Sequence, residues 1–558
     1  MRLKLLQPAL LGLLIINALP AVAQPVIYPL GVKNAASYRA ASWPGQGLAP
    51  GSIFVVKGAG LGPAELLHAT PPYPARLPDA EGGARITITP VASGASVDAA
   101  ILYAWEWQIA GILPPDTPLG PADVTVSWQG ETSDPQRVEI LPAAVGLFTQ
   151  AMNGSGPGVI QNYKTPDDQP LNSLTRPGLP GEYLILWATG LGTADNRWFD
   201  RDVEVELGDL RLRPSYAGPA PGYPGLDQIN VRLPDDGSLP EGCYTKLSVS
   251  AGDYTSPPVL VSTARQPGVC KHPMGLSAET LARLDAGGRV PIAQLSIQTA
   301  DFDTSGTVGT SNFASASARV FATPALELSG SDPSHMFDDL PMGCAMSSGG
   351  IVGVLLDGPA SFPPPAPLPF LAVDAGERLE LTGPADRTAS LTKTPLWERY
   401  GAYSSDDLTD DFFTQGIWTL TAPGGADAGP FTVSVRLPPA PQAVIPAVLD
   451  RAENYKVTWD TTGYAPGDRV AVRVSSRERL PLDPRVSFPV SVLCLAAASS
   501  GSVTVPADLL QNLHSPKDGQ VNVNVLPAPE DRTTFVTPGI EYGSFTWSRS
   551  VHRMIEIR

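Results

Sequence analysis

The sequence predicts an all-β protein built from tandem immunoglobulin-like β-sandwich domains. Three observations carry this prediction: short runs alternate apolar and polar residues, turn residues recur about every 8–12 residues, and one long segment is duplicated. The chain holds 60 prolines and 54 glycines, a density typical either of disorder or of a turn-rich β protein. The apolar content of 43% favours the β protein, because it suffices to bury hydrophobic cores.

The first 23 residues have the three parts of a secretory leader. Arg2 and Lys4 precede an apolar stretch that is too short to span a bilayer, and Ala21 and Ala23 place small residues before Gln24. A buried N-terminal helix is the alternative, but the charged start and the small residues favour a leader. We therefore expect a protein that is secreted or held at the cell surface, with no transmembrane segment after cleavage of the leader.

The length of 558 residues is too great for one hydrophobic core, so several domains are expected. A proline-rich stretch at residues 438–441 is the clearest linker in the chain. The predicted units are the leader at 1–23, an Ig-like module 1 at 24–142, an Ig-like module 2 at 143–270, a β-rich domain of uncertain type at 271–437, and a C-terminal β-sandwich at 442–558.

Modules 1 and 2 are predicted as two copies of one unit. Residues 54–62 match residues 184–192 at an offset of 130, and Gln108-Ile109 matches Gln228-Ile229 at an offset of 120. Each match is followed by an alternating strand, a polar turn and another strand. The Gly-Ala-Gly run at 58–60 is not a nucleotide-binding loop, because Pro63 stands where the third glycine belongs and no helical pattern follows.

Several short motifs in modules 1 and 2 resemble the Solibacter-type C-terminal domain of secreted acidobacterial proteins. They stand at residues 31–38, 48–52, 60–62, 145–148, 187–192, 216–223 and 227–231. The Gly-Leu-Gly strands also resemble the IPT/TIG sandwich, and residues 420–427 and 501–506 carry a shorter likeness to the same secreted proteins. The resemblance implies an Ig-like fold and export, but no catalytic residues, because that family has no established activity. Residues 103–108 depart from its pattern, which puts the first module's loop in doubt.

The charge of the chain limits its partners. The formal net charge is −17 and no run of lysine or arginine occurs, which disfavours nucleic acids and anionic membranes. The sequence does not identify the partner, and an extracellular glycan or protein is the working expectation.

The four cysteines suit an exported protein with disulfides. Cys243 and Cys270 flank one strand pair inside module 2, so we expect them to form a bridge. Cys344 and Cys494 fall in separate predicted domains, and the sequence leaves open whether they pair across that boundary or stay free.

Trp105 and Trp107 are the candidate binding residues of module 1. With Tyr103 and Trp128 they form an aromatic cluster that, if exposed, would suit stacking on a sugar or on a hydrophobic partner. The alternative is favoured: alternate residues of one strand share a face, so Trp105 and Trp107 would fill the sandwich core.

Asp301, Asp303 and Ser305 form the candidate metal site. Their spacing, with Gly306 at the sixth position, resembles the start of a calcium loop. Asn312 stands at the twelfth position instead of the glutamate that a strong loop needs, so a polar β-turn is the favoured alternative. The five histidines are scattered and lack the spacing of zinc ligands, so calcium is the only cofactor that the sequence suggests, and no cofactor is the simpler expectation.

No catalytic residues are identified, so the expected function is non-catalytic extracellular binding, adhesion or structural support. A nucleophile elbow motif is absent. The alternative is an enzyme that acts on an extracellular polysaccharide or other polymer, with its site in residues 290–437. That region holds four aspartates in residues 406–411, a run that is more typical of a solvated loop than of a glycosidase pair.

Overall fold

Module 1 folds as two antiparallel sheets around one core. The computed structural model describes residues 24–42, 46–192, 202–303, 311–324, 343–348, 370–405, 408–409, 411–439, 442–479, 487–511, 513, 520–528 and 533–558. The first sheet has the order β1 (Val26–Asn34), β2 (Ile53–Ala59), β7 (Gln108–Ile112), β6 (Ala100–Trp105) and β3 (Leu67–His68). The second has the order β10 (Gln136–Ile140), β8 (Gly120–Trp128), β4 (Arg85–Pro90) and β5 (Val97–Asp98), with β9 (Glu131–Thr132) beside β8. Alternate residues of each strand, such as Phe54, Ile86 and Val124, meet in the core between the sheets.

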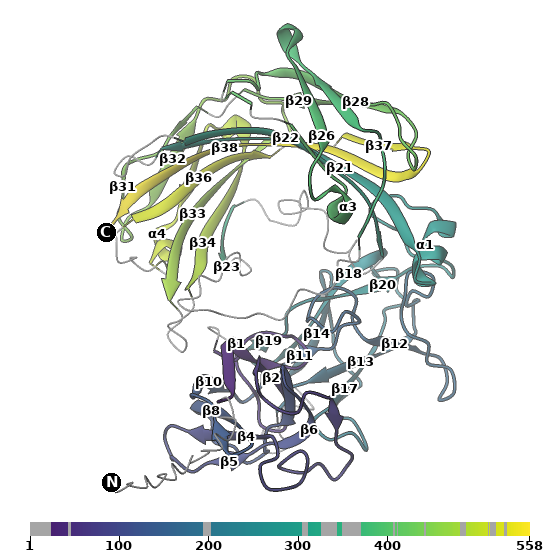
Figure 1. Ribbon diagram of the computed structural model, residues 1–558, viewed down its shortest axis with the longest axis vertical. Helices are drawn as coiled ribbons and strands as arrows, with labels where there is room; N and C mark the ends of the chain where they lie inside the picture. Colours follow the sequence, from purple (N-terminus) through teal and green to yellow (C-terminus); the bar gives the residue numbers. More distant parts are fainter. Residues whose placement is uncertain are drawn as a thin grey trace, which may run out of the picture.

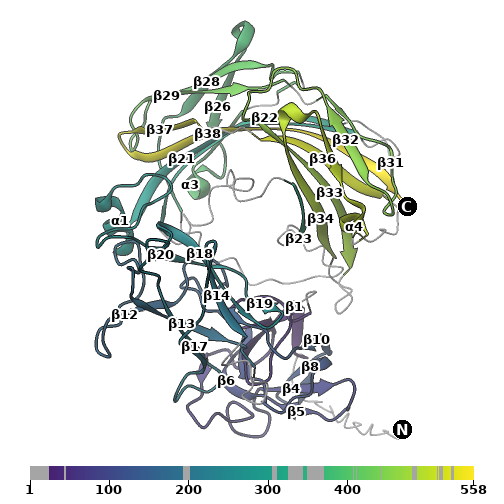
Figure 2. The same cartoon turned by 180° about the vertical axis from the view of Figure 1, so that it is seen from behind.

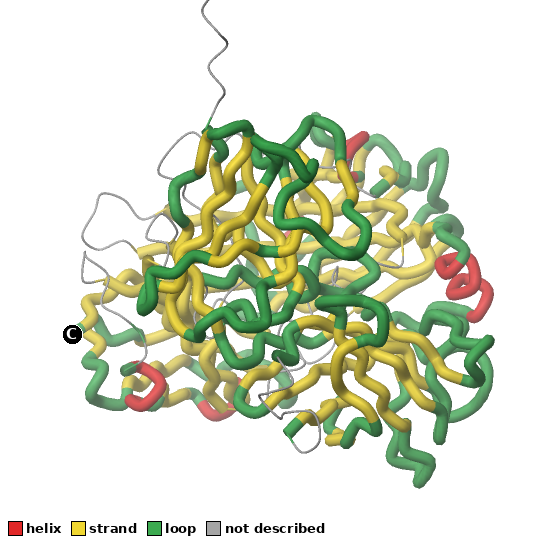
Figure 3. The backbone as a smooth tube through the Cα atoms, turned by 90° about the horizontal axis from the view of Figure 1, so that it is seen from below, coloured by secondary structure: helices red, strands yellow, loops and turns green. Residues whose placement is uncertain are grey.

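Module 2 repeats this plan. One sheet has the order β11 (Gly146–Leu147), β13 (Tyr183–Thr189), β17 (Asp227–Arg232) and β16 (Tyr216–Pro219), with β12 (Ile160–Tyr163) also paired to β13. The other has the order β15 (Leu210–Leu212), β14 (Val203–Leu207), β18 (Gly242–Ala251) and β19 (Tyr254–Thr255), with β20 (Val259–Thr263) paired to β18. Both modules occupy the lower half of the molecule in Figure 1, in purple to teal, and Figure 3 shows far more strand than helix in the described residues. The predicted all-β class with tandem Ig-like sandwiches is confirmed.

The repeat holds at the level of strand register. Val56 lies opposite Ile109 in module 1, and Leu186 lies opposite Ile229 in module 2. Two buried serines repeat as well: the backbone N–H of Val126 donates to Ser133 Oγ at 3.0 Å, and that of Val249 donates to Ser256 Oγ at 3.0 Å. Duplicated sequence therefore folds into duplicated geometry.

Most of the described strands in the second half of the chain belong to one 15-stranded sheet, which extends across the predicted domain boundary. Its main order is β23 (Gly343–Ser348), β34 (Ser487–Ala497), β33 (Arg469–Arg479), β36 (Gln520–Ala528), β38 (Ile540–Ile557), β21 (Arg289–Asp303), β22 (Ser311–Pro324), β27 (Ala402–Ser405), β26 (Thr388–Lys393), β25 (Arg378–Thr382), β28 (Gly416–Ala422) and β29 (Phe431–Leu437). The short strands β24 (Leu371–Ala372), β31 (Val448–Leu449) and β37 (Thr533–Thr537) pair with β22, β38 and β38. A separate sheet holds β30 (Ala443–Val444), β32 (Tyr455–Trp459) and β35 (Ser502–Val505).

The boundary predicted at residues 438–441 needs correction, because strand β38 belongs to both sides of it. Phe545 and Trp547, near its start, lie in the core of the region that follows module 2, whereas Ile555 and Ile557, at its end, lie in the C-terminal core. Strand β38 pairs in parallel with β21, about 250 residues away in sequence, and runs in yellow along the arched sheet of Figures 1 and 2. Two cores therefore share one sheet.

Both possible disulfides are present. Cys243–Cys270 lies inside module 2, as predicted. Cys344–Cys494 joins directly opposed residues of β23 and β34, which settles the open alternative in favour of a bridge between the two predicted domains.

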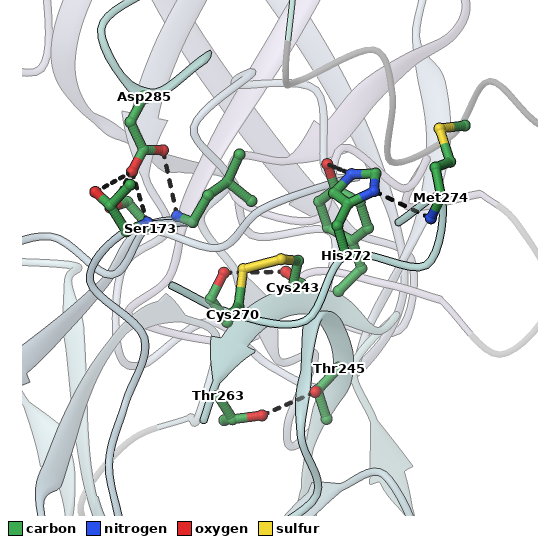
Figure 4. Close-up of a disulfide and its surroundings, with 12 residues drawn as sticks. Ser173, Cys243, Thr245, Thr263, Cys270, His272, Met274 and Asp285 are labelled. Atoms are coloured by element: carbon green, nitrogen blue, oxygen red, sulfur yellow. Dashed lines mark hydrogen bonds between the residues drawn. A yellow bond between two sulfur atoms is a disulfide. The ribbon is translucent and has the colours of Figure 1, made fainter. Parts of the chain in front are cut away.

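The described helices and helical turns are short: α1 (Ala278–Asp285), η4 (Pro384–Asp386), α3 (Trp397–Tyr400), η5 (Ala498–Ser500) and α4 (Ala507–Leu510). Helix α1 fastens the large sheet to module 2. Its last residue, Asp285, accepts hydrogen bonds from Ser173 Oγ at 2.8 Å and from the backbone N–H of Thr175 at 2.8 Å, close to the Cys243–Cys270 bridge (Figure 4).

The two repeated serines yield a matched test of the repeat. Ser133→Ala and Ser256→Ala each leave a buried N–H without its acceptor, so each should cost about 1–3 kcal/mol of local stability. We expect faster amide hydrogen exchange in β8 for the first variant and in β18 for the second. Ser127→Ala, which removes an exposed hydroxyl contact, is the control. Equal exchange in all three variants would contradict this role of the serines.

Candidate functional site

Strand β13 places an aromatic row on the outside of module 2. Leu184, Leu186 and Ala188 point into the core, so the intervening residues must lie on the opposite face of the sheet. These are Tyr183, Ile185 and Trp187. Tyr183 is 38% exposed and Trp187 is half-buried, so both rings reach the surface.

Neighbouring strands complete the surface around this row. Tyr163 on β12 lies directly opposite Tyr183, while Asn230 and Gln228 on β17 lie opposite Ile185 and Trp187. We call Tyr163, Tyr183, Trp187, Gln228 and Asn230 the aromatic–amide face. Together with Gln169, Ile185 and Ser215, these residues line a depression of about 470 Å³.

Hydrogen bonds fix the orientation of the polar groups in this depression. The indole N–H of Trp187 donates to Gln161 Oε1 at 2.9 Å, and Gln161 Nε2 donates to the backbone oxygen of Gln169 at 2.9 Å. Gln228 Nε2 donates to Asn230 Oδ1 at 3.0 Å. Among the residues that the structure describes, Gln228 Oε1 and Asn230 Nδ2 have no protein partner, so they leave one acceptor and one donor for a ligand.

The electrostatics of the depression are neutral. None of its eight lining residues carries a charge. Arg232 follows on β17 opposite Tyr183, but its guanidinium is paired with Asp235 at 2.7 Å. Aromatic rings supply flat apolar contact area and the amides supply directional hydrogen bonds, a combination that suits a neutral, hydroxyl-rich ligand.

Asp227 is the buried carboxyl group beside this face. Its Oδ2 accepts the backbone N–H of Leu191 at 2.9 Å, which holds the Gly-Leu-Gly turn against the start of β17. Burial raises the pKa of Asp227 to about 7, although the backbone N–H groups of Leu191 and Gly190 act in the opposite direction. Thr189 joins the same corner to module 1, because its Oγ1 accepts the backbone N–H of Ile53 at 2.9 Å.

The preferred interpretation of Trp105 and Trp107 as core residues is wrong. A register shift between Ile101 and Tyr103 puts Ala104 into the core, so the next residue, Trp105, lies on the outward face. Glu106 and Trp107 form the two-residue turn between β6 and β7, so Trp107 is outside the strand alternation. Trp105 is 38% exposed and its indole N–H donates to the backbone oxygen of Ala64 at 3.0 Å, while Trp107 is half-buried. Neither lines the depression of module 2.

The candidate calcium residues are only partly described. Asp301 is exposed near the end of β21, where Arg553 Nη2 lies 3.3 Å from its Oδ2. Asp303 is the last residue of that strand, and Ser305 lies outside the described residues. Within the described ranges, no group of three or more His, Cys, Asp or Glu side chains could hold a metal ion. Calcium binding stays a prediction.

The acidic run at 406–411 is also largely outside the described residues, which include only Asp411 of its four aspartates. Asp411 Oδ1 accepts a hydrogen bond from Thr409 Oγ1 at 2.8 Å, and this contact lowers the pKa of Asp411. A general acid needs a raised pKa, so Asp411 does not have the character of one.

Sequence reasoning found the motifs of the aromatic–amide face without recognising a site. The sequence identifies Trp187 and Gln228 as parts of the repeat and of the family resemblance, not as binding residues. The sequence signal is the pair of repeat offsets, which place Trp187 at the position of Lys57 and Gln228 at that of Gln108. Only the structure shows that the members of each pair lie opposite each other on the outward face.

The described helices include none that is long and apolar enough to cross a membrane.

No family model matches the chain, and no curated protein matches it. Several solved structures, among them the following three, have weak likenesses to it. The FN1–FN3 domains of chicken CNTN1 are 9% identical over 74% of this chain and 99% of that chain, with a TM-score of 0.13. Domains 4–9 of the surface layer protein SbsC are 13% identical over 93% and 83%, with a TM-score of 0.15. A fragment of titin is 10% identical over 74% and 93%, with a TM-score of 0.14. At such scores these likenesses carry no argument, and the fold rests on the strands and registers described above.

Asp227 yields a prediction on pH and stability. Its ordinary pKa is 3.8 and its folded pKa is about 7, so between these values the folded chain binds more protons than the unfolded chain and stability falls as the pH rises. Asp227→Asn cannot ionise and can still accept the N–H of Leu191. Urea unfolding measures the free energy of unfolding of both proteins. We expect that of the wild type to fall, relative to that of the variant, between pH 5 and pH 8. A difference between the two proteins that is independent of pH would contradict the assignment.

Proposed function

We propose that this chain is an exported, non-catalytic β-sandwich protein that binds a neutral polysaccharide through the aromatic–amide face of module 2. The observation that carries the proposal is the depression itself. It combines three aromatic side chains, two amides with free hydrogen-bonding groups, and no charge. Sugar rings present C–H faces that stack on aromatic rings and hydroxyls that exchange hydrogen bonds with amides.

The shape of the face favours an extended chain over a single sugar. Tyr183 and Trp187 stand four residues apart on one strand, so their Cα atoms are separated by about 13 Å at the rise of a β-strand. Such a span accommodates several consecutive sugar rings. Tyr163, directly across from Tyr183, widens the platform at one end.

The two disulfides support export, because structural disulfides persist in oxidising environments outside the cytoplasm. The leader-like residues 1–23 point the same way but lie outside the described residues. Membership of the Solibacter-type family, which the motifs of modules 1 and 2 suggest, is part of the same proposal.

The alternative of an enzyme with its site in residues 290–437 has less support. Asp374, in the described part of that region, has a lowered pKa because it accepts the backbone N–H of Gly376. Asp227, whose pKa is raised, belongs to module 2 and is committed to the backbone of Leu191. An acid–base pair needs two facing carboxyls with opposite shifts.

The proposal is tested with variants of the two exposed aromatic residues of β13. Trp187→Ala and Tyr183→Ala should each weaken binding to one of a panel of soluble neutral polysaccharides: hydroxyethylcellulose, galactomannan, arabinoxylan and amylose. A central aromatic contact is worth about 2 kcal/mol, so roughly a 30-fold loss is expected by affinity gel electrophoresis. Trp105→Ala is the matched control, since it removes an exposed tryptophan outside the depression.

Unchanged binding by Trp187→Ala and Tyr183→Ala would overturn this site. A loss confined to Trp105→Ala would move the site to module 1, and binding to none of the four polymers would overturn the neutral polysaccharide as ligand.

A further inference from the structure

Module 1 presents a different chemistry at the position of the aromatic–amide face. Lys57 lies opposite Gln108, as Trp187 lies opposite Gln228 in module 2. Trp105 lies opposite Gln108 on its other side, so Lys57, Gln108 and Trp105 form one row across three strands. Module 1 therefore carries a cation, Lys57, at the position where module 2 has the neutral Trp187.

A second cation, Lys33, lies near Lys57, and a third, Arg39, lies near Lys33. Lys33 on β1 is half-buried next to Val55, and Arg39 is exposed in the turn that follows β1. We call Lys33, Arg39 and Lys57 the cationic face. Lys33 Nζ donates to the backbone oxygen of Tyr38 at 3.4 Å, and Lys57 Nζ lies 4.8 Å above the Tyr38 ring.

Within the described part of the chain, no carboxylate neutralises this face. Among the described residues, none of the three cations has an acidic side chain within ion-pair distance, in a chain that contains 55 Asp and Glu residues. Burial and the charges of Lys57 and Arg39 together lower the pKa of Lys33 to about 8, and burial lowers that of Lys57. The positive charges are thus held together against their mutual repulsion, which an incoming anion would relieve.

Polar aromatic groups border the cations. Gln108 Nε2 donates to the hydroxyl of Tyr103, and Trp105 is exposed at the end of the same row. A ligand held here would meet cations, phenol and amide groups and an indole side by side. That combination fits a sugar that bears an acidic group better than it fits a small inorganic anion. A small anion has no apolar surface to pack against the aromatic rings, whereas a sugar ring does.

We propose that the cationic face of module 1 is a second binding site, and that its ligand is an acidic polysaccharide whose carboxylate or sulfate groups lie against Lys33, Arg39 and Lys57. This inference does not rest on the neutral-polysaccharide site of module 2, because it involves other residues on another module. The two faces would let one chain bind both neutral and acidic polymers.

The test uses the full chain and affinity gel electrophoresis with four probes: polygalacturonate for carboxylate, dextran sulfate for sulfate, polyglutamate for an acidic peptide, and hydroxyethylcellulose as the neutral polymer. The double variant Lys33→Gln/Lys57→Gln should bind the preferred acidic polysaccharide at least tenfold more weakly. Lys57→Arg keeps the charge and should retain binding. Lys164→Gln, which removes an exposed lysine of module 2, is the matched control.

The pH dependence separates binding from a structural role. The titratable and charged groups around Lys33 are Lys57 on β2 and Arg39 and Tyr38 in the turn after β1. Tyr103 on β6 interacts with Tyr38 and lies one group further away. Lys33 loses its proton as the pH rises through about 8, so affinity for the acidic polymer should fall between pH 7 and pH 9. Lys33→Arg keeps its charge over that range and should remove the fall.

Three results would overturn the proposal. One is equal binding of the acidic polysaccharides by the wild type and the double variant while both have the same melting temperature. Another is tighter binding of polyglutamate than of either acidic polysaccharide, which would make the partner an acidic protein segment. The third is no binding of polygalacturonate or dextran sulfate by the wild type.

Discussion

The alternation of side chains along β13 is the constraint on which both the fold and the site of module 2 depend. Leu184, Leu186 and Ala188 must enter the core, where they meet the second sheet of the sandwich. Because side chains alternate along a strand, burial of these three residues places Tyr183 and Trp187 on the outward face, independently of any binding role. A shift of register by one residue would bury the aromatic row and expose the leucines, so the binding face is as strongly specified as the core.

Duplication then explains why two surfaces of different chemistry occupy one framework. Core positions repeat in kind, as in Val56 and Leu186 or Ile109 and Ile229, because both copies must fill the same space between two sheets. Side chains on the outward face do not have to fill that space, so the equivalent positions Lys57 and Trp187 differ in chemistry. The large sheet adds a separate unit, which Asp285 of α1 fastens to the loop of Ser173 and Thr175.

Local patterns predicted what depends on local chemistry and missed what depends on distant partners. The strand period, the repeat and the Cys243–Cys270 bridge followed from spacing within one module. The parallel pairing of β38 with β21 joins segments about 250 residues apart, and no short motif encodes it. The core prediction for Trp105 and Trp107 is wrong because a register shift puts Ala104 into the core in place of Trp105, and because Trp107 lies in a turn. The aromatic–amide face was missed because Tyr163, Tyr183 and Asn230 become neighbours only once three strands have paired.

The most direct measurement is a crystal structure of the chain with a neutral oligosaccharide, such as cellopentaose or mannopentaose, chosen by the polymer that the chain binds in solution. The account predicts sugar rings stacked on Trp187 and Tyr183, with hydroxyl groups hydrogen-bonded to Gln228 Oε1 and Asn230 Nδ2. Sugar density elsewhere on the molecule, with the depression of module 2 filled only by water, would contradict it.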